Sequence, residues 1–159
     1  VLGANDGIVS VAGLVMGVAG AGGDQPTLVL AGVAAVVAGS ISMGGGEYVS
    51  VSSQRDAEIA YGRSKLEVNA HPWGAAWSSF VAFALGALLP LIAITGPWQE
   101  VRLQATVVSV VLALTLTGWW AAWAAKAPRA RSIARNVLVS LLTMGISYAI
   151  GSLLGVTVL

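Results

Sequence analysis

Three side chains in mostly apolar surroundings could bind a metal ion. Asp6 follows Asn5 near the first residue, Met43 lies within a long uncharged stretch, and Glu47 follows directly after that stretch. Met43 and Glu47 are four residues apart, so on a helix they face the same way. A thioether is a soft ligand and a carboxylate is a hard one, and together they suit a divalent transition metal.

Each of these residues can also be explained by a structural role that needs no metal ion. Asn5-Asp6-Gly7 could be the turn that begins a helix, with Asp6 as the N-cap. Glu47 could lie near the membrane surface and pair with Arg55, and a lone methionine is usually core filler. The three glycines between Met43 and Glu47 favour the metal reading, because they let an ion or another backbone come close.

The number of ligands bears on assembly. One chain offers three side chains, whereas a divalent metal takes about four to six ligands. Two copies around a shared axis would double the set, and closed twofold symmetry is the commonest oligomer. We therefore expect a homodimer with a metal path between its two copies.

The elements that carry these residues must lie in a membrane. The chain has 159 residues, of which 57% are hydrophobic and 9% charged, against about 25% charged in soluble domains. Asp, Glu, Lys and Arg are absent from 7–23, 25–46, 68–99, 103–125 and 136–159. All but the first of these stretches exceed the ~20 residues that a spanning helix needs. This composition excludes a disordered chain and a nucleic-acid-binding protein.

The uncharged stretches do not alternate apolar and polar residues as barrel strands do, which leaves helices. We predict an all-α integral membrane protein with five transmembrane helices in a single transmembrane domain, 1–159. The predicted helices cover about 3–22, 26–51, 73–95, 101–125 and 133–158, with a short cytoplasmic loop at 52–72. Pro26 suits a first helical turn, and Gly96-Pro97 and Pro128 suit helix ends.

Basic residues predict the orientation. With five spans, the second-to-third and fourth-to-fifth loops lie on one side of the membrane. They hold every Lys and Arg except Arg102, namely Arg55, Arg63, Lys65, Lys126, Arg129, Arg131 and Arg135. The positive-inside rule therefore places the N-terminus in the cytoplasm and the C-terminus outside or in a lumen. Tryptophans near the span ends would act as interfacial anchors; they are Trp73, Trp98, Trp119, Trp120 and Trp123.

Small residues recur at the spacing of one helix face. Gly3/Gly7, Gly13/Gly17 and Gly151/Gly155 are Gly-x-x-x-Gly pairs, and the second helix repeats Ala31, Ala35, Gly39 and Met43. Such residues let helix backbones approach closely in lipid. The pattern fits packing within one subunit and packing between subunits equally well.

Two segments resemble motifs of the vacuolar iron transporter family. Residues 3–11 (GANDGIVSV) resemble the opening of the family's first helix, and residues 42–50 (SMGGGEYVS), continued by Gln54-Arg55-Asp56, resemble its second-helix motif. Residues 71–76, 86–91 and 151–156 also fit, so that the resemblance covers nearly the whole chain.

The resemblance implies a five-helix homodimer that moves Fe²⁺, and often Mn²⁺ or other divalent metals such as Co²⁺, out of the cytoplasm in exchange for protons. The path would run along the dimer interface between the first two helices. Asp6, Met43 and Glu47 match the family's path residues, with Asp6 and Glu47 coupling to protons. An acidic residue that some members carry would fall near Ala35, which makes this path less acidic in its middle.

The chain departs from many members between Gln54 and Pro72, where they insert a cytoplasmic metal-gathering domain. Here Asp56, Glu58 and Glu67 could receive metal from the cytoplasm. Nodulin-like members lack the domain, so either a short loop or a missing stretch explains the departure. Some bacterial relatives carry a ferritin-like domain before the first helix. His71, before Pro72, fits a helix cap better than a metal ligand.

We therefore predict a metal–proton antiporter, with Fe²⁺ as transported substrate and no tightly bound cofactor. The alternative is a non-transporting membrane module that anchors or serves a ferritin-like storage domain. An enzyme is not expected, because the spans hold no nucleophile–base pair. The expected partners are a second copy, the lipid bilayer, divalent metal ions and protons, without nucleic acid. We expect a bacterial plasma membrane, or a vacuolar membrane if the source is eukaryotic.

Overall fold

The computed structural model describes residues 2–63 and 70–158. Within these ranges all regular structure is helical: α1 (Leu2–Gly20), α2 (Gln25–Ala60), α3 (Pro72–Thr95), the 3-10 turn η1 (Gln99–Val101), α4 (Arg102–Ala124) and α5 (Arg129–Val158). The five α-helices are long and apolar enough to cross a membrane. The predicted all-α fold with five spanning helices is confirmed.

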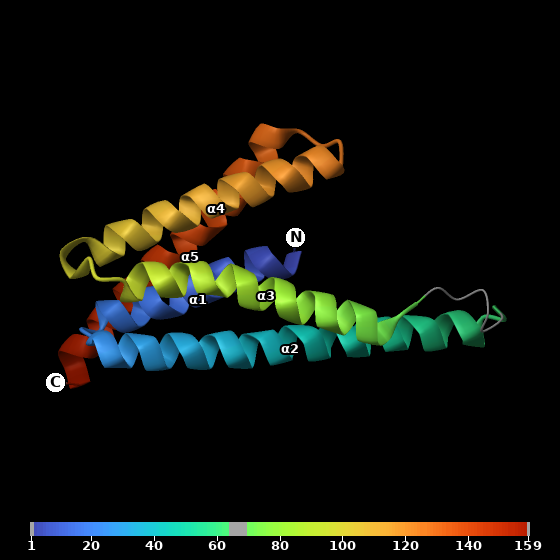
Figure 1. The fold of residues 1–159 in the computed structure, drawn as a ribbon, viewed down its shortest axis with the longest axis horizontal. Helices are drawn as coiled ribbons and strands as arrows, with labels where there is room; N and C mark the ends of the chain where they lie inside the picture. The colour runs from blue at the N-terminus through green and yellow to red at the C-terminus, as the bar shows by residue number, and fades with distance from the viewer. Residues whose placement is uncertain (1, 64–69, 159) are drawn as a thin grey trace.

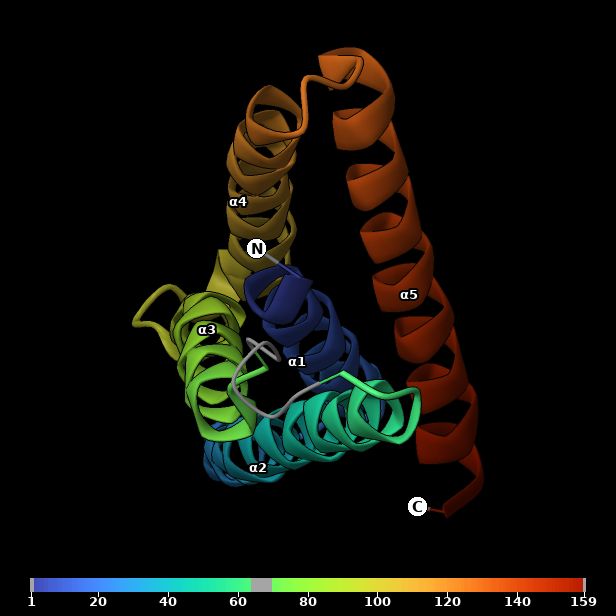
Figure 2. The same cartoon turned by 90° about the vertical axis from the view of Figure 1, so that its right-hand side faces the viewer.

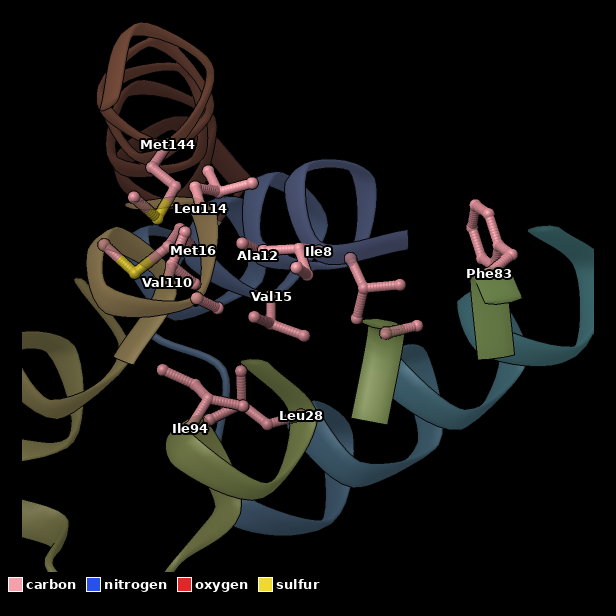
Figure 3. Packing of buried hydrophobic residues seen from close by; sticks show 13 residues of the cluster. Ile8, Ala12, Val15, Met16, Leu28, Phe83, Ile94, Val110, Leu114 and Met144 are labelled. Atoms are coloured by element: carbon pink, nitrogen blue, oxygen red, sulfur yellow. The ribbon is translucent and has the colours of Figure 1, made fainter. Parts of the chain in front are cut away.

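Helix α1 lies at the centre of the bundle. Figure 2 shows α2 and α3 on one side of it and α4 and α5 on the other, and α1 contacts all four. Its buried side chains meet those of every neighbour in one apolar cluster, which includes Val15 of α1, Leu28 of α2, Ile94 of α3, Leu114 of α4 and Met144 of α5 (Figure 3). Asp6 therefore lies on the helix that contacts all the others, although its own side chain is exposed.

Large apolar side chains also cover the outside of the bundle. Leu30, Leu116 and Leu153 are each about seven-tenths exposed, at 73%, 68% and 70%. Such a surface would promote aggregation in water. In a bilayer it is the surface that contacts lipid.

Glycines bring α1 against α3 and α5. A Cβ on Gly7 would collide with the carbonyl oxygen of Phe83, and one on Gly151 with the carbonyl oxygen of Gly17. A Cβ on Gly13 would lie 2.8 Å from Cγ2 of Thr143. The Gly-x-x-x-Gly pairs of α1 and α5 thus serve packing within the chain, which is one of the two readings that their spacing allowed.

Local signals set most helix ends. Asp24 is the N-cap of α2, where its carboxylate accepts from the backbone N–H of Thr27 at 3.0 Å, and Pro26 lies in the first turn as predicted. The hydroxyl and backbone N–H of Thr27 lower the pKa of Asp24 below its ordinary value, since both bonds favour the charged form. Gly96 caps α3 after Thr95.

The end of α2 was predicted wrongly. The helix runs to Ala60, not Val51, and it ends where Gly62 adopts a φ of 90°. The N–H of Gly62 donates to the carbonyl of Ile59 and that of Arg63 to Glu58, as in a Schellman cap. Residues 52–60 are mostly polar but contain neither Gly nor Pro, so the helix continues beyond the apolar stretch. Likewise, α5 begins at Arg129 and not near 133.

Candidate metal-binding groove

The three predicted metal ligands line one groove. It has a volume of about 470 Å³ and lies between α1 and α2, with Phe83 of α3 also in its wall. Asp6, Ser10, Val11 and Leu14 come from α1, and Ala35, Gly39, Ser42, Met43, Gly46 and Glu47 come from α2. The structure therefore brings Asp6 together with Met43 and Glu47 across two helices, although they are far apart in sequence.

Asp6 is not an N-cap. Helix α1 already includes Leu2, so Asp6 lies within the helix and not at its start, and its side chain is exposed. Its Oδ1 instead accepts from the hydroxyl of Ser10, one turn later, at 3.2 Å. A single neutral donor leaves most of the lone pairs of the carboxylate free for a cation.

Met43 and Glu47 are both half-buried, and Met43 also packs against the apolar cluster. The glycines between them differ in role. Gly44 packs on α3, with Ala76 O only 3.1 Å from an added Cβ, whereas Gly46 has open space and lines the groove. Removing side chains here leaves room for an ion beside Glu47. Among the described residues, the ion pair formed is Arg63–Glu58, and Glu47 is not paired with Arg55.

Three further groove residues were not predicted. Ser10 and Ser42 add hydroxyl oxygens to the wall, and Phe83 closes it from α3. Ser10 could have been found, because it follows Asp6 by one helical turn. Phe83 depends on how α3 packs, which spacing along α1 and α2 does not reveal. Ala35 does line the groove, so its middle carries a methyl group where an acidic side chain is expected in some relatives.

The other predicted acidic residues lie away from the groove. Asp56 and Glu58 are on the last turns of α2, and at 1.5 Å per residue Asp56 is about 13 Å beyond Glu47 along the helix. Glu58 accepts from Arg63 at 3.0 Å. Glu67 lies outside the described residues. His71 takes the N-cap position of α3, as expected, but its side chain makes no capping hydrogen bond.

The groove offers two carboxylates, one thioether and hydroxyl oxygens from a single chain. No group of three or more His, Cys, Asp or Glu side chains lies together anywhere in residues 2–63 and 70–158. Such a set suits a divalent cation that enters and leaves more than one that is held permanently, because structural sites are fully enclosed by ligands.

A family model and several individual proteins are similar to this chain over most of its length. A family model described as the VIT family matches residues 1–67 and 59–152. Vacuolar iron transporter homolog 1 of Arabidopsis thaliana is 42% identical over 162 residues, which covers 98% of this chain and 81% of the relative. Vacuolar iron transporter homolog 5 of Oryza sativa subsp. japonica is 40% identical, covering 94% and 76%. VIT-like transporter 1b of Glycine max is 34% identical, covering 100% and 76%. The chain therefore belongs to the VIT family.

Proposed function

We propose that this chain carries Fe²⁺ across a membrane, with Asp6, Met43 and Glu47 as the ligands along its path. The proposal rests on one observation: Asp6, Met43 and Glu47 line a single groove between two candidate membrane-spanning helices of a VIT-family chain. The relatives are named as transporters, and this chain is accordingly a transporter and not an enzyme. Ionisable residues inside spans are costly and commonly mark ion pathways.

The functional unit is a homodimer whose two grooves face each other. On α2, small residues are exposed at the groove or next to its lining residues along the helix: Ala34, Ala38, Ser42 and Gly46. An added Cβ on Gly46 meets nothing within 4 Å. This smooth surface suits close helix contact in lipid, and a second copy would complete the ligand set of Asp6, Met43 and Glu47.

Transport runs from the cytoplasm outward in exchange for protons. Asp6 and Glu47 can each hold a metal ion or a proton, which links the two movements. Mn²⁺ and Co²⁺ share the path, because its ligands include both oxygen and sulfur. The names of the relatives refer to the vacuole, and the expectation of a bacterial plasma membrane stays a prediction.

The short connection between α2 and α3 is native to this branch of the family. The alignment with the Arabidopsis relative runs for 162 residues against a chain of 159, which leaves no room for an inserted domain in the aligned stretch of that relative. The two segments matched by the family model meet at 59–67, the same place where many members were expected to carry an insertion.

The test is Fe²⁺ uptake by sealed vesicles that contain the purified chain, with a pH dye inside. The wild type should accumulate Fe²⁺ and move protons the opposite way. Asp6→Asn should lower uptake roughly tenfold or more, the scale at which even outer partners of a bound metal act. Asp24→Asn is the matched control: it removes a carboxylate in the turn between α1 and α2 but keeps an N-cap side chain, and it should transport normally.

Binding of Fe²⁺ by the wild type without any uptake would favour the alternative, a membrane module that serves a storage domain. Uptake that ignores an imposed pH gradient would leave a transporter and reject proton exchange.

A further inference from the structure

The turn between α4 and α5 carries an uncompensated cluster of cations. Lys126, Arg129, Arg131 and Arg135 are all exposed, and no Asp or Glu follows Glu100 in the chain. In the described part of the other basic loop, Arg63 has a carboxylate partner in Glu58 at 3.0 Å. None of these four cations has an ion-pair partner among the described residues; Arg135 lines a separate pocket that also includes Asp6, whereas Lys126, Arg129 and Arg131 do not line it. Such a cluster attracts an anion.

A pocket of about 580 Å³ lies within this cluster. Lys126 and Arg129 form its cationic part, and Ala122, Trp123, Ala124 and Ala127 form the rest. Figures 1 and 2 show the turn projecting away from α1, α2 and α3, so the pocket is remote from the metal-binding groove. The lining thus combines apolar and positively charged side chains, which matches a ligand with an apolar part and an anionic part.

Arg129 is held in place for binding an anion. Its guanidinium lies over the ring of Trp119, 5.7 Å from the ring centroid, a cation–π contact. This contact restrains the guanidinium, and because Arg129 is exposed its N–H groups remain accessible for bidentate contact with phosphate oxygens. Arg129 is also the first residue of α5, so the positive end of the helix dipole points into the same region.

Lys126 occupies a position that normally favours glycine. Its φ is 53°, and among the described residues it alone has a positive φ without being glycine. The N–H of Lys126 donates to the carbonyl of Trp123, and that of Ala127 to Ala122. These bonds form a Schellman cap with Lys126 at the left-handed position. A lysine there strains the backbone, and strain of this kind points to a use for the side chain.

We propose that this pocket binds the phosphate headgroup of an anionic phospholipid. Lys126 and Arg129 contact the phosphate, and the lipid's acyl chains lie along α4 beside Trp123. Tryptophans commonly sit at headgroup depth, and Trp119, Trp120 and Trp123 are all exposed on the last turns of α4. Basic pockets between spanning helices suit anionic headgroups. The assignment is independent of metal transport.

The test is native mass spectrometry of the full chain with equal amounts of phosphatidylglycerol and phosphatidylcholine of matched acyl chains. The wild type should retain phosphatidylglycerol preferentially. Arg129→Gln and Lys126→Gly should each lower that preference about fivefold, the effect of one basic residue near an anionic surface. Lys126→Gly also separates binding from folding, because glycine suits the left-handed position and its heat stability in detergent should not fall.

Arg63→Gln is the matched control, since it removes the same charge from the other basic loop and should leave the preference unchanged. Equal retention of the two lipids by the wild type would overturn the proposal, and so would an equal loss in Arg63→Gln and Arg129→Gln. Excess inorganic phosphate should not displace the lipid. Displacement by phosphate would assign the pocket to a free anion and also overturn it.

Discussion

Met43 and Glu47 lie one helical turn apart, and their substitutions separate ligation from packing. Met43 contacts the apolar cluster as well as the groove, so its loss could act through either. Met43→Leu nearly conserves volume and should cost less than about 1.5 kcal/mol of stability. The thioether favours softer metals than Mn²⁺. We therefore expect Fe²⁺ and Co²⁺ uptake to fall more than Mn²⁺ uptake, measured in the same vesicles.

Glu47→Gln provides the contrast at the next turn. It keeps the size of the side chain and removes a charge that every divalent cation uses, so uptake of all three metals should fall together. If Met43→Leu leaves the ratio of Fe²⁺ to Mn²⁺ uptake unchanged, Met43 only packs, and the path depends on Asp6 and Glu47.

At the scale of the helix, close packing makes specific glycines irreplaceable. A Cβ on Gly151 would collide with the carbonyl of Gly17, whereas one on Gly145 of the same helix meets nothing within 4 Å. Gly151→Ala must push α1 and α5 apart, and we expect a loss of about 1–3 kcal/mol, as for overpacked cores. Gly145→Ala should instead stabilise by about 0.5–1 kcal/mol. Thermal unfolding in detergent measures both, and equal effects would contradict the packing of α1 on α5.

The helices could be predicted from the sequence because uncharged stretches of spanning length leave few alternatives in lipid. The end of α2 could not be predicted from apolar residues alone. The helix continues without a break from the apolar stretch through the mostly polar residues 52–60, and the glycine at position 62 is the signal that marks its end. The four-residue separation of Met43 and Glu47 was enough to predict that they lie on the same face of one helix. Their approach to Asp6 depends on how α1 and α2 pack, which needed the structure, although the family motifs pointed to the same residues.

For the whole molecule, the positive-inside rule predicts which ends face the cytoplasm. The chain has no cysteine, so a single introduced cysteine is the only thiol that a reagent can label. Cysteines replacing Pro97, between α3 and η1, and Ala127, between α4 and α5, would both be exposed. A membrane-impermeant thiol reagent added to intact cells should label Pro97→Cys at once and Ala127→Cys only after permeabilisation. The reverse pattern would invert the predicted orientation.

Formation of the proposed homodimer depends on which surface of the whole molecule meets a second copy. Gly13 and Gly17 face α5 within the chain, so cross-links through them are not expected. Ala38 and Ser42 are small and exposed on α2; Ser42 lines the groove, and Ala38 is next to Gly39 of its lining. Since a disulfide needs Cβ atoms within about 3.5–4.5 Å, Ala38→Cys or Ser42→Cys should form a cross-linked dimer under mild oxidation. Leu116→Cys, which is 68% exposed on α4, is the control for random collision in the membrane. A dimer that forms through Leu116→Cys and through neither α2 position would place the interface on α4 and leave each groove with the proposed ligands of one chain only.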